Sequence, residues 1–184
     1  GNRMRPLTLH TPKPLLQVAE KPLIVWHIEK LKKIGVTEII INTAWLADKL
    51  VDTLGDGSLL GVKILWSHEA EGLETAGGII NALPLLGDDP FILVNGDVWT
   101  TMDFASLLKV KLIDDLAHLV FVPNPVQHPQ GDFVLSNGKA YTFEQAQIGE
   151  ALTYSGVAVL SPKLFENLEH GKRPLAPLLK QAML

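Results

Sequence analysis

The sequence predicts an α/β domain whose first half is a doubly wound, mostly parallel sheet and whose second half adds antiparallel strands. In the first hundred residues, apolar runs of strand length alternate with segments of helical periodicity, the pattern of βαβ crossovers. After Asp103, strand-like runs follow one another with turn signals between them. Apolar residues make up 47% of the 184 positions and charged residues 20%, which is typical of a globular protein with a core.

Turn and cap residues delimit the elements of the first half. Pro22 suits the first turn of a helix, apolar residues follow at helical spacing, and Gly35 ends it. The β-branched run 37–42 favours a strand, and Gly55-Asp56-Gly57 ends the helix after it. The expected elements are helices at about 22–34, 45–54 and 76–83, and strands at 37–42, 62–66 and 90–95.

The second half is dominated by strands. Ser136-Asn137-Gly138 suits a tight hairpin turn. No internal repeat, low-complexity tract or linker interrupts the sequence, so we expect one domain over residues 1–184. The expected elements are strands at 118–123, 132–135, 139–143 and 153–160, and helices at about 163–168 and 175–183.

Composition excludes several classes of protein. The chain has no cysteine, so disulfides, thiolate metal sites and a cysteine nucleophile are ruled out. No run approaches twenty apolar residues, and the first six residues do not resemble a secretory signal; we expect a soluble, cytoplasmic protein without a membrane partner. Residues 1–33 carry seven basic and two acidic groups, a charge of +5, whereas the rest carry nine and 18, a charge of −9. This asymmetry favours a local anion site over a nucleic-acid surface.

Two segments carry groups suited to phosphate and metal chemistry. Asn95-Gly96-Asp97 directly follows the most apolar strand, and ligands of open α/β sheets bind at such strand ends. A carboxylate there suits a Mg²⁺ ligand or a sugar-hydroxyl acceptor, or it is an ordinary turn residue. Lys13 stands between Pro12 and Pro14 on a stiffened backbone, and with Arg3 it can hold a polyphosphate; a plain basic loop is the alternative.

Three further segments are weaker candidates. In Leu73–Gly78, Thr75 is the expected N-cap, and the two glycines after Ala76 predict close approach by a flat or anionic group. Gly131-Asp132 and Ser155-Gly156 can face a sugar, although each alone is more often structural. The six histidines show no metal or triad spacing, and we interpret them as surface or packing residues; they are His10, His27, His68, His118, His128 and His170.

Together these motifs resemble those of the sugar-phosphate nucleotidyltransferases. The opening eight residues with Pro12-Lys13-Pro14-Leu15 resemble the family's signature loop, Leu73–Gly77 its base-recognition segment, and Asn95-Gly96-Asp97 its metal-binding turn. Segments 9–14, 95–99 and 131–133 resemble members that use N-acetylmuramic acid 1-phosphate. The resemblance implies a three-layer α/β/α, Rossmann-like fold and transfer of UMP from UTP to a sugar 1-phosphate with Mg²⁺, in cell-wall precursor recycling.

The resemblance also implies site roles. Arg3, Lys13 and Asp97 would be catalytic, and Asp97 would hold Mg²⁺. The implied nucleotide contacts are Gly1, Arg3, Lys13, Glu74, Thr75, Gly77 and Asn95. The implied sugar contacts are Gly131, Asp132, Ser155 and Gly156.

Two parts of the family's pattern are not found in residues 1–184: a first strand leading into the signature loop, and a second metal carboxylate near the C-terminus. We therefore expect a part of a longer catalytic domain that is inactive as it stands. The alternatives are a mannose-1-phosphate guanylyltransferase, a glucose-1-phosphate thymidylyl- or uridylyltransferase, a non-catalytic nucleotide-sugar-binding regulatory subunit, and a plain α/β binding module. Lys13 and Asp97 favour an enzyme over the last two.

Overall fold

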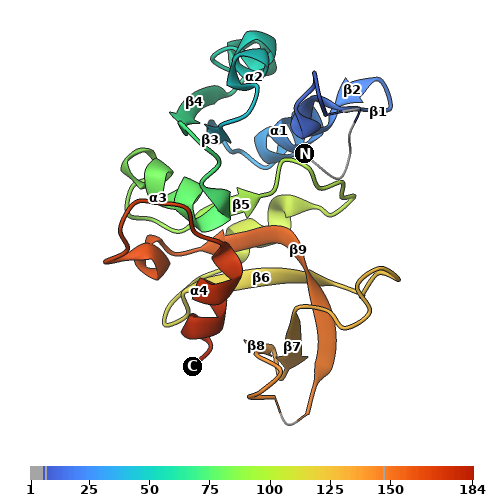
Figure 1. The fold of residues 1–184 in the computed structure, drawn as a ribbon, viewed down its shortest axis with the longest axis vertical. Coiled ribbons are helices and arrows are strands. Elements are labelled where there is room, and N and C mark those ends of the chain that lie inside the picture. The colour runs from blue at the N-terminus through green and yellow to red at the C-terminus, as the bar shows by residue number, and fades with distance from the viewer. Residues whose placement is uncertain (1–5, 7, 147) are drawn as a thin grey trace.

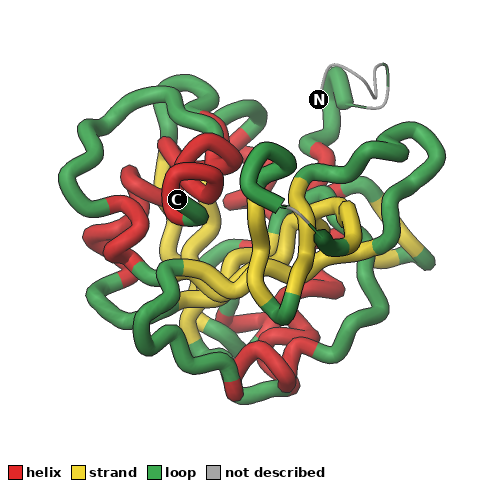
Figure 2. Tube along the Cα trace, turned by 90° about the horizontal axis from the view of Figure 1, so that it is seen from below, coloured by secondary structure: helices red, strands yellow, loops and turns green. Residues whose placement is uncertain are grey.

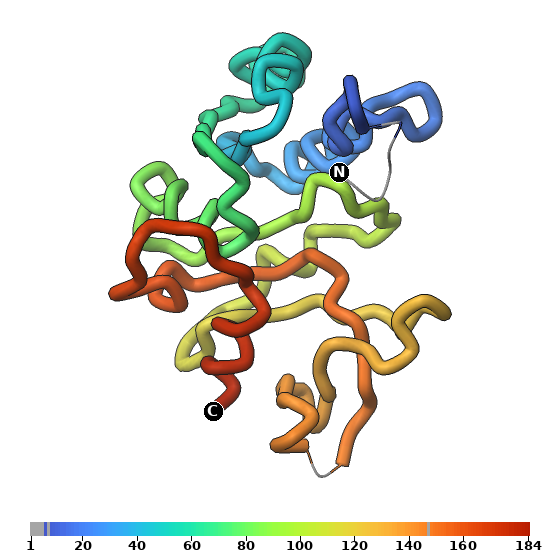
Figure 3. The backbone as a smooth tube through the Cα atoms, in the orientation of Figure 1, coloured from blue at the N-terminus to red at the C-terminus, as the bar shows by residue number. Residues whose placement is uncertain are grey.

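The computed structural model describes residues 6, 8–146 and 148–184. Helices lie on both sides of the strands, so the molecule has three layers (Figure 2). The first third of the chain, with α1 (Leu23–Lys33) and α2 (Ala47–Leu54), forms one end, and the later strands form the other (Figures 1 and 3). Parallel and antiparallel pairings both occur, and the expected α/β class is confirmed.

The first half alternates strands and helices as the sequence predicts. β3 (Glu38–Thr43) and β4 (Lys63–His68) pair in parallel and are joined through α2. α1 and α2 bury apolar side chains against this pair, with Ile28 at the centre of the cluster. α3 (Glu74–Leu86) then leads to β5 (Phe91–Val94). Each of these elements overlaps its expected segment.

The second sheet is built around β9 (Glu150–Leu160), an 11-residue strand. β5, β6 (Ala117–Val122) and β7 (Phe133–Ser136) all pair with it antiparallel, and β8 (Lys139–Tyr141) pairs with β7. Because β5 pairs with β9 and not with β3, parallel pairing within the described ranges is confined to β3 and β4. Fewer strands therefore pair in parallel than the alternation of strands and helices in the sequence predicts.

The β7–β8 hairpin confirms the turn expected at Ser136-Asn137-Gly138. Ser136 pairs with Lys139 across a two-residue loop. Asn137 has φ 49° and Gly138 has φ 76°. Both central residues have the left-handed backbone conformation. A turn of this kind matches the twist of the flanking strands, and Asn-Gly adopts it readily.

Several short elements are not evident in the sequence. β1 (Gln17–Val18) and β2 (Lys21–Pro22) form a hairpin whose turn residues, Ala19 and Glu20, have positive φ without the usual Asn or Gly signal. The helix expected at 163–168 is a 3₁₀ turn, Pro162–Phe165, capped by the Ser161 side chain. None of the helices placed in the structure is long and apolar enough to cross a bilayer. The remaining elements are α4 (Leu175–Ala182) and 3₁₀ turns at Lys13–Leu15, Ser58–Leu60 and Phe104–Lys109.

A cavity of about 570 Å³ lies between β3 and β5, flanked by α1 and α3; we call it the β3–β5 slot. Apolar side chains line most of it, including Ile39 and Ile41 of β3 and Ile92 and Val94 of β5. All four residues of β5, the most apolar strand, are only half-buried. The slot therefore separates the parallel pair from the β9 sheet, and its polar end coincides with the carboxyl ends of both strands.

Candidate active site

The expected nucleotide-binding residues meet at the polar end of the β3–β5 slot. Glu74 and Thr75, at the start of α3, and Asn95, just after β5, all line the cavity. Pro14 and Gly96 line it as well, which brings the N-terminal loop beside the turn that follows β5. Segments from three distant parts of the chain therefore surround one opening, at the strand ends where α/β sheets bind ligands.

Lys13 and Asp97, 84 positions apart, form an ion pair at this opening. The Lys13 Nζ donates to Asp97 Oδ2 at 2.8 Å. The side chains are 29% and 42% exposed, so both remain accessible to a ligand. Lys13 begins a short 3₁₀ turn between two prolines, as the sequence predicts for a fixed backbone. The two groups expected to act on phosphate and metal are therefore adjacent.

Helix α1 holds the turn that carries Asp97. His27, buried on α1, donates from Nε2 to the Val98 carbonyl at 2.6 Å. Lys30, one turn later, donates to the carbonyls of Thr100 and Met102. Burial lowers the pKa of His27, because an apolar environment disfavours the imidazolium. The packing role expected for His27 is thus observed, and it fixes the backbone next to Asp97.

Asp97 is the group best suited to a divalent cation. In the parts of the chain that the structure describes, no cluster of three acidic or histidine side chains surrounds it or forms elsewhere. A closed, all-protein cage is therefore not formed by these residues. Mg²⁺ is commonly bound by one or two carboxylates together with substrate phosphates and water. A partly exposed carboxylate beside a lysine fits that kind of site.

The expectation that Thr75 caps α3 is wrong. The helix begins at Glu74, after Leu73, and Thr75 lies inside the first turn with its side chain exposed. No side chain caps α3; Glu69 instead holds the residue before the helix, because its Oε2 accepts from the Leu73 amide at 2.9 Å. Its other carboxylate oxygen accepts from Asn42 at 3.3 Å. Thr75 lines the slot.

Gly77 accommodates the chain's own backbone. Its amide donates to the Arg173 carbonyl at 3.0 Å, and the Arg173 amide donates to the Leu73 carbonyl at 2.9 Å. A Cβ on Gly77 would lie 2.3 Å from the Gly171 oxygen. The close approach expected at this glycine is therefore made by residues 171–173.

Of the expected sugar contacts, Ser155 and Gly156 lie on β9 beyond the end of β5, whereas Gly131 and Asp132 directly precede β7, where the Asp132 amide donates to the Leu152 carbonyl of β9. The Asn95 amide donates to the Gly156 carbonyl at 2.9 Å. Gly156 has φ 82°, and a Cβ there would lie 2.7 Å from Asn95 Nδ2, so only glycine lets these residues approach. Asp132 Oδ2 accepts from the Tyr154 amide at 2.8 Å. Ser155 Oγ accepts from the Val157 amide at 3.2 Å.

The structure thus brings together Lys13, Asp97, Asn95, Glu74 and Thr75, with the sugar candidates extending from Gly156. Gly1 and Arg3 lie outside the described residues. Sequence reasoning missed two residues that shape the opening. Asn42 donates to the Gly78 carbonyl at 2.7 Å, and Glu69 accepts from the Leu73 amide just before α3. A polar residue at the end of β3 was the available signal for Asn42, since ligand sites gather at strand ends.

The chain is similar to several known proteins. A family model described as "nucleotidyl transferase" matches residues 1–132. N-acetylmuramate alpha-1-phosphate uridylyltransferase of Neisseria meningitidis serogroup B (strain ATCC BAA-335 / MC58) is 51% identical over 188 residues, which cover 100% of this chain and 81% of that protein.

More distant relatives share parts of the chain or its fold. The mannose-1-phosphate guanylyltransferase catalytic subunit beta of Dictyostelium discoideum is 32% identical over 177 residues, 92% of this chain and 49% of that protein. A Bacillus anthracis structure assigned as a glucose-1-phosphate thymidylyltransferase, in complex with sucrose, superposes with a TM-score of 0.84 at 21% identity, covering 100% of this chain and 80% of that one.

Proposed function

The chain belongs to the nucleotidyl transferase family, and we propose that it transfers UMP from UTP to N-acetylmuramic acid 1-phosphate. The products are UDP-N-acetylmuramic acid and pyrophosphate. The relative that acts on this sugar phosphate is 51% identical across the whole chain, which supports the choice of substrates. The observation that carries the proposal is the 2.8 Å pair of Lys13 and Asp97 at the slot opening.

The reaction requires positioning and charge neutralisation more than covalent catalysis. An oxygen of the sugar phosphate attacks the α-phosphorus of UTP, and the bond to the bridging oxygen breaks to release pyrophosphate. Lys13 would contact both phosphates and offset the charge that develops between them. Arg3 and Gly1, from the N-terminal loop, would hold the triphosphate. The 2.8 Å ion pair with Asp97 supports this role of Lys13.

Asp97 would hold the divalent cation, which we propose is Mg²⁺. When bound, the cation neutralises charge on the phosphates. The His27 hydrogen bond to Val98 keeps the Asp97 turn in place. The carboxylate's partial exposure leaves room for the phosphates and water to complete the coordination.

The remaining residues would select base, ribose and sugar. Glu74, Thr75 and Asn95 line the slot opening and offer a carboxylate, a hydroxyl and an amide to base and ribose. Gly77 would contribute by admitting the 171–173 backbone beside them. Gly131, Asp132, Ser155 and Gly156 would form the sugar side of the site, where β9 extends beyond β5.

We propose that the β3–β5 slot holds a further strand, the one that the resemblance places ahead of Gly1. The slot is apolar, lies between two strand edges and is covered by α1 and α3, which suits a buried parallel strand. We also propose a cytoplasmic location, where UTP is present, and a role in cell-wall precursor recycling. Residues 1–184 would belong to one nucleotidyltransferase domain.

A substrate matrix tests the proposed reaction. Purified full-length protein, with Mg²⁺, is incubated with each of the four nucleoside triphosphates and with several sugar 1-phosphates, and pyrophosphate release is measured. The proposal predicts the highest kcat/KM for UTP with N-acetylmuramic acid 1-phosphate. A preference for GTP with mannose 1-phosphate, or for glucose 1-phosphate, would contradict the proposed substrates and indicate another specificity of the same family. Nucleotide binding without turnover would indicate a regulatory subunit.

A further inference from the structure

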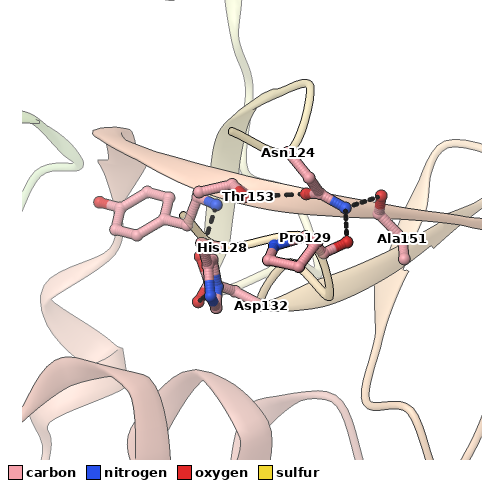
Figure 4. Close-up of polar contacts among 7 residues, drawn as sticks. Asn124, His128, Pro129, Asp132, Ala151 and Thr153 are labelled. Atoms are coloured by element: carbon pink, nitrogen blue, oxygen red, sulfur yellow. Dashed lines mark hydrogen bonds and ion pairs between the residues drawn. The ribbon is translucent and has the colours of Figure 1, made fainter. Parts of the chain in front are cut away.

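The loop between β6 and β7 is tied to β9 by a small polar network (Figure 4). Asn124 donates to the carbonyls of Pro129 at 3.2 Å and Ala151 at 2.9 Å, and accepts from the Thr153 hydroxyl at 2.8 Å. Asp132 accepts from the Tyr154 amide at 2.8 Å. These bonds fix the loop at both of its ends.

His128 lies in this loop with one ring nitrogen engaged. Its Nε2 is 3.0 Å from Asp132 Oδ1. Because an ionised carboxylate only accepts hydrogen bonds, Nε2 carries the proton in this contact. The His128 side chain is 44% exposed, so the ring is oriented by Asp132 and remains open to solvent.

This network adjoins the proposed sugar side of the active site. Tyr154 is two residues from Gly156 on β9, a separation of roughly 7 Å along a strand. Gly156 in turn contacts Asn95, which follows β5. The path from the reacting phosphate to His128 therefore runs along the part of β9 that extends past β5, in the direction in which a sugar would lie.

His128 is the one basic residue in the segments that form this side of the site. The segments that form this side of the site are 123–138 and 150–162, and neither contains a lysine or an arginine. His128 is the one histidine in both segments. A negatively charged substituent on the sugar would find no other positive side chain within these two segments.

We infer that His128 selects sugar 1-phosphates that carry a carboxylate, an inference that rests on the proposed function. N-acetylmuramic acid differs from N-acetylglucosamine by a lactyl ether that ends in a carboxylate. The imidazolium of His128 has two N–H donors: Nε2 contacts Asp132, and Nδ1 donates to the lactyl carboxylate. Asp132 then acts as a positioning residue that holds the ring through its contact with Nε2.

Kinetics with a charged and a neutral form of one sugar test this role. The substrates are N-acetylmuramic acid 1-phosphate and its lactyl amide, which has nearly the same shape without the charge. Wild-type protein is expected to favour the acid, and His128→Ala to reduce the acid-to-amide ratio of kcat/KM by roughly 10- to 100-fold, as for the loss of a charge-assisted hydrogen bond. His128→Gln, which keeps a donor for Asp132 but no charge, is expected to lose the same preference.

The matched control is His118→Ala, which removes an exposed histidine on β6 and is expected to keep the wild-type ratio. The inference is overturned if both His128 variants keep the wild-type acid-to-amide ratio of kcat/KM. This includes the case in which kcat/KM falls equally for the acid and the amide. The thermal unfolding of each variant is measured to show that it is folded. If the alanine variant is not folded, His128→Gln alone is used for the comparison.

A spectroscopic readout keeps this inference separate from the proposed reaction. NMR of the histidine side chains follows titration of wild-type protein with N-acetylmuramic acid 1-phosphate. The inference predicts that the ring signals of His128 shift when the acid binds and do not shift in the same way with the amide. Absence of turnover with UTP would refute the proposed function alone. A His128 signal that responds in the same way to the acid and to the amide would refute the selection role alone.

Discussion

Lys13 and Asp97 are close enough for a strong electrostatic interaction, yet they are poorly placed to stabilise the fold. Ion pairs exposed to this extent contribute about 0–1 kcal/mol to stability. The geometry instead leaves each group available for a charged ligand. The Lys63–Glu38 pair, also 2.8 Å long and exposed, lies on β3 and β4 and provides a comparison without a proposed role.

Gly77 is a residue where a single methyl group is expected to be costly. Gly77→Ala would place a Cβ 2.3 Å from the Gly171 oxygen, which is backbone and cannot move aside cheaply. We expect a loss of about 1–3 kcal/mol in the free energy of unfolding, measured by urea denaturation. Gly72→Ala is the control, because a Cβ there meets nothing within 4 Å. Equal stability of the two variants would contradict the contact with 171–173.

His27 predicts a pH dependence of stability. Its pKa lies below the ordinary value of 6.5 because the ring is buried. Above pH 6.5 neither the folded nor the unfolded chain binds a proton at His27, so its contribution to stability is complete. As the pH falls below 6.5, the unfolded chain binds a proton first, and the contribution decreases until the folded pKa is reached.

The measurement compares urea denaturation of wild type and His27→Gln between pH 7.5 and 5.5. The wild-type free energy of unfolding should fall more steeply with decreasing pH, by at most about 1.4 kcal/mol per pH unit. His118→Gln changes an exposed histidine and should retain the wild-type slope. Identical slopes for wild type and His27→Gln would show that His27 is not a buried neutral group.

At the scale of elements, the sequence predicted the helices and turns whose conformation depends on neighbouring residues. The helical spacing after Pro22 and the Asn137-Gly138 turn both correspond to observed elements, because periodicity and turn geometry are set within a few residues. The β1–β2 turn through Ala19 and Glu20 gave no signal, because neither residue type is one that favours positive φ. Thr75 was misassigned as a cap because α3 begins one residue earlier, at Glu74, after Leu73.

The β3–β5 slot makes a prediction about the two strands beside it. If a further strand occupies the slot in the complete domain, amides on the facing edges of β3 and β5 become hydrogen-bonded. Hydrogen exchange of residues 91–94 should therefore be much slower in a chain extended ahead of Gly1 than in residues 1–184. Amides of 157–160, already paired with β5 and β6, provide the internal control. Equal exchange of 91–94 in both chains would exclude that strand.

At the scale of the whole molecule, the site is an assembly of distant segments. The N-terminal loop, the start of α3, the turn after β5 and the first part of β9 meet at the end of the slot. Motif order indicated which segments matter, but not that Lys13 pairs with Asp97 or that Gly77 admits residues 171–173. Those contacts depend on how the elements pack, which periodicity does not encode.

The central claim is that Lys13 and Asp97 form the reacting centre of a uridylyltransferase. The most direct test is single-turnover formation of UDP-N-acetylmuramic acid, measured by mass spectrometry in the full-length protein for wild type, Lys13→Ala and Asp97→Asn, with Lys63→Ala as control. The account predicts that both site variants lose product formation by orders of magnitude at nearly unchanged stability, while Lys63→Ala retains the wild-type rate. Product formation within a few-fold of wild type in either site variant would contradict it.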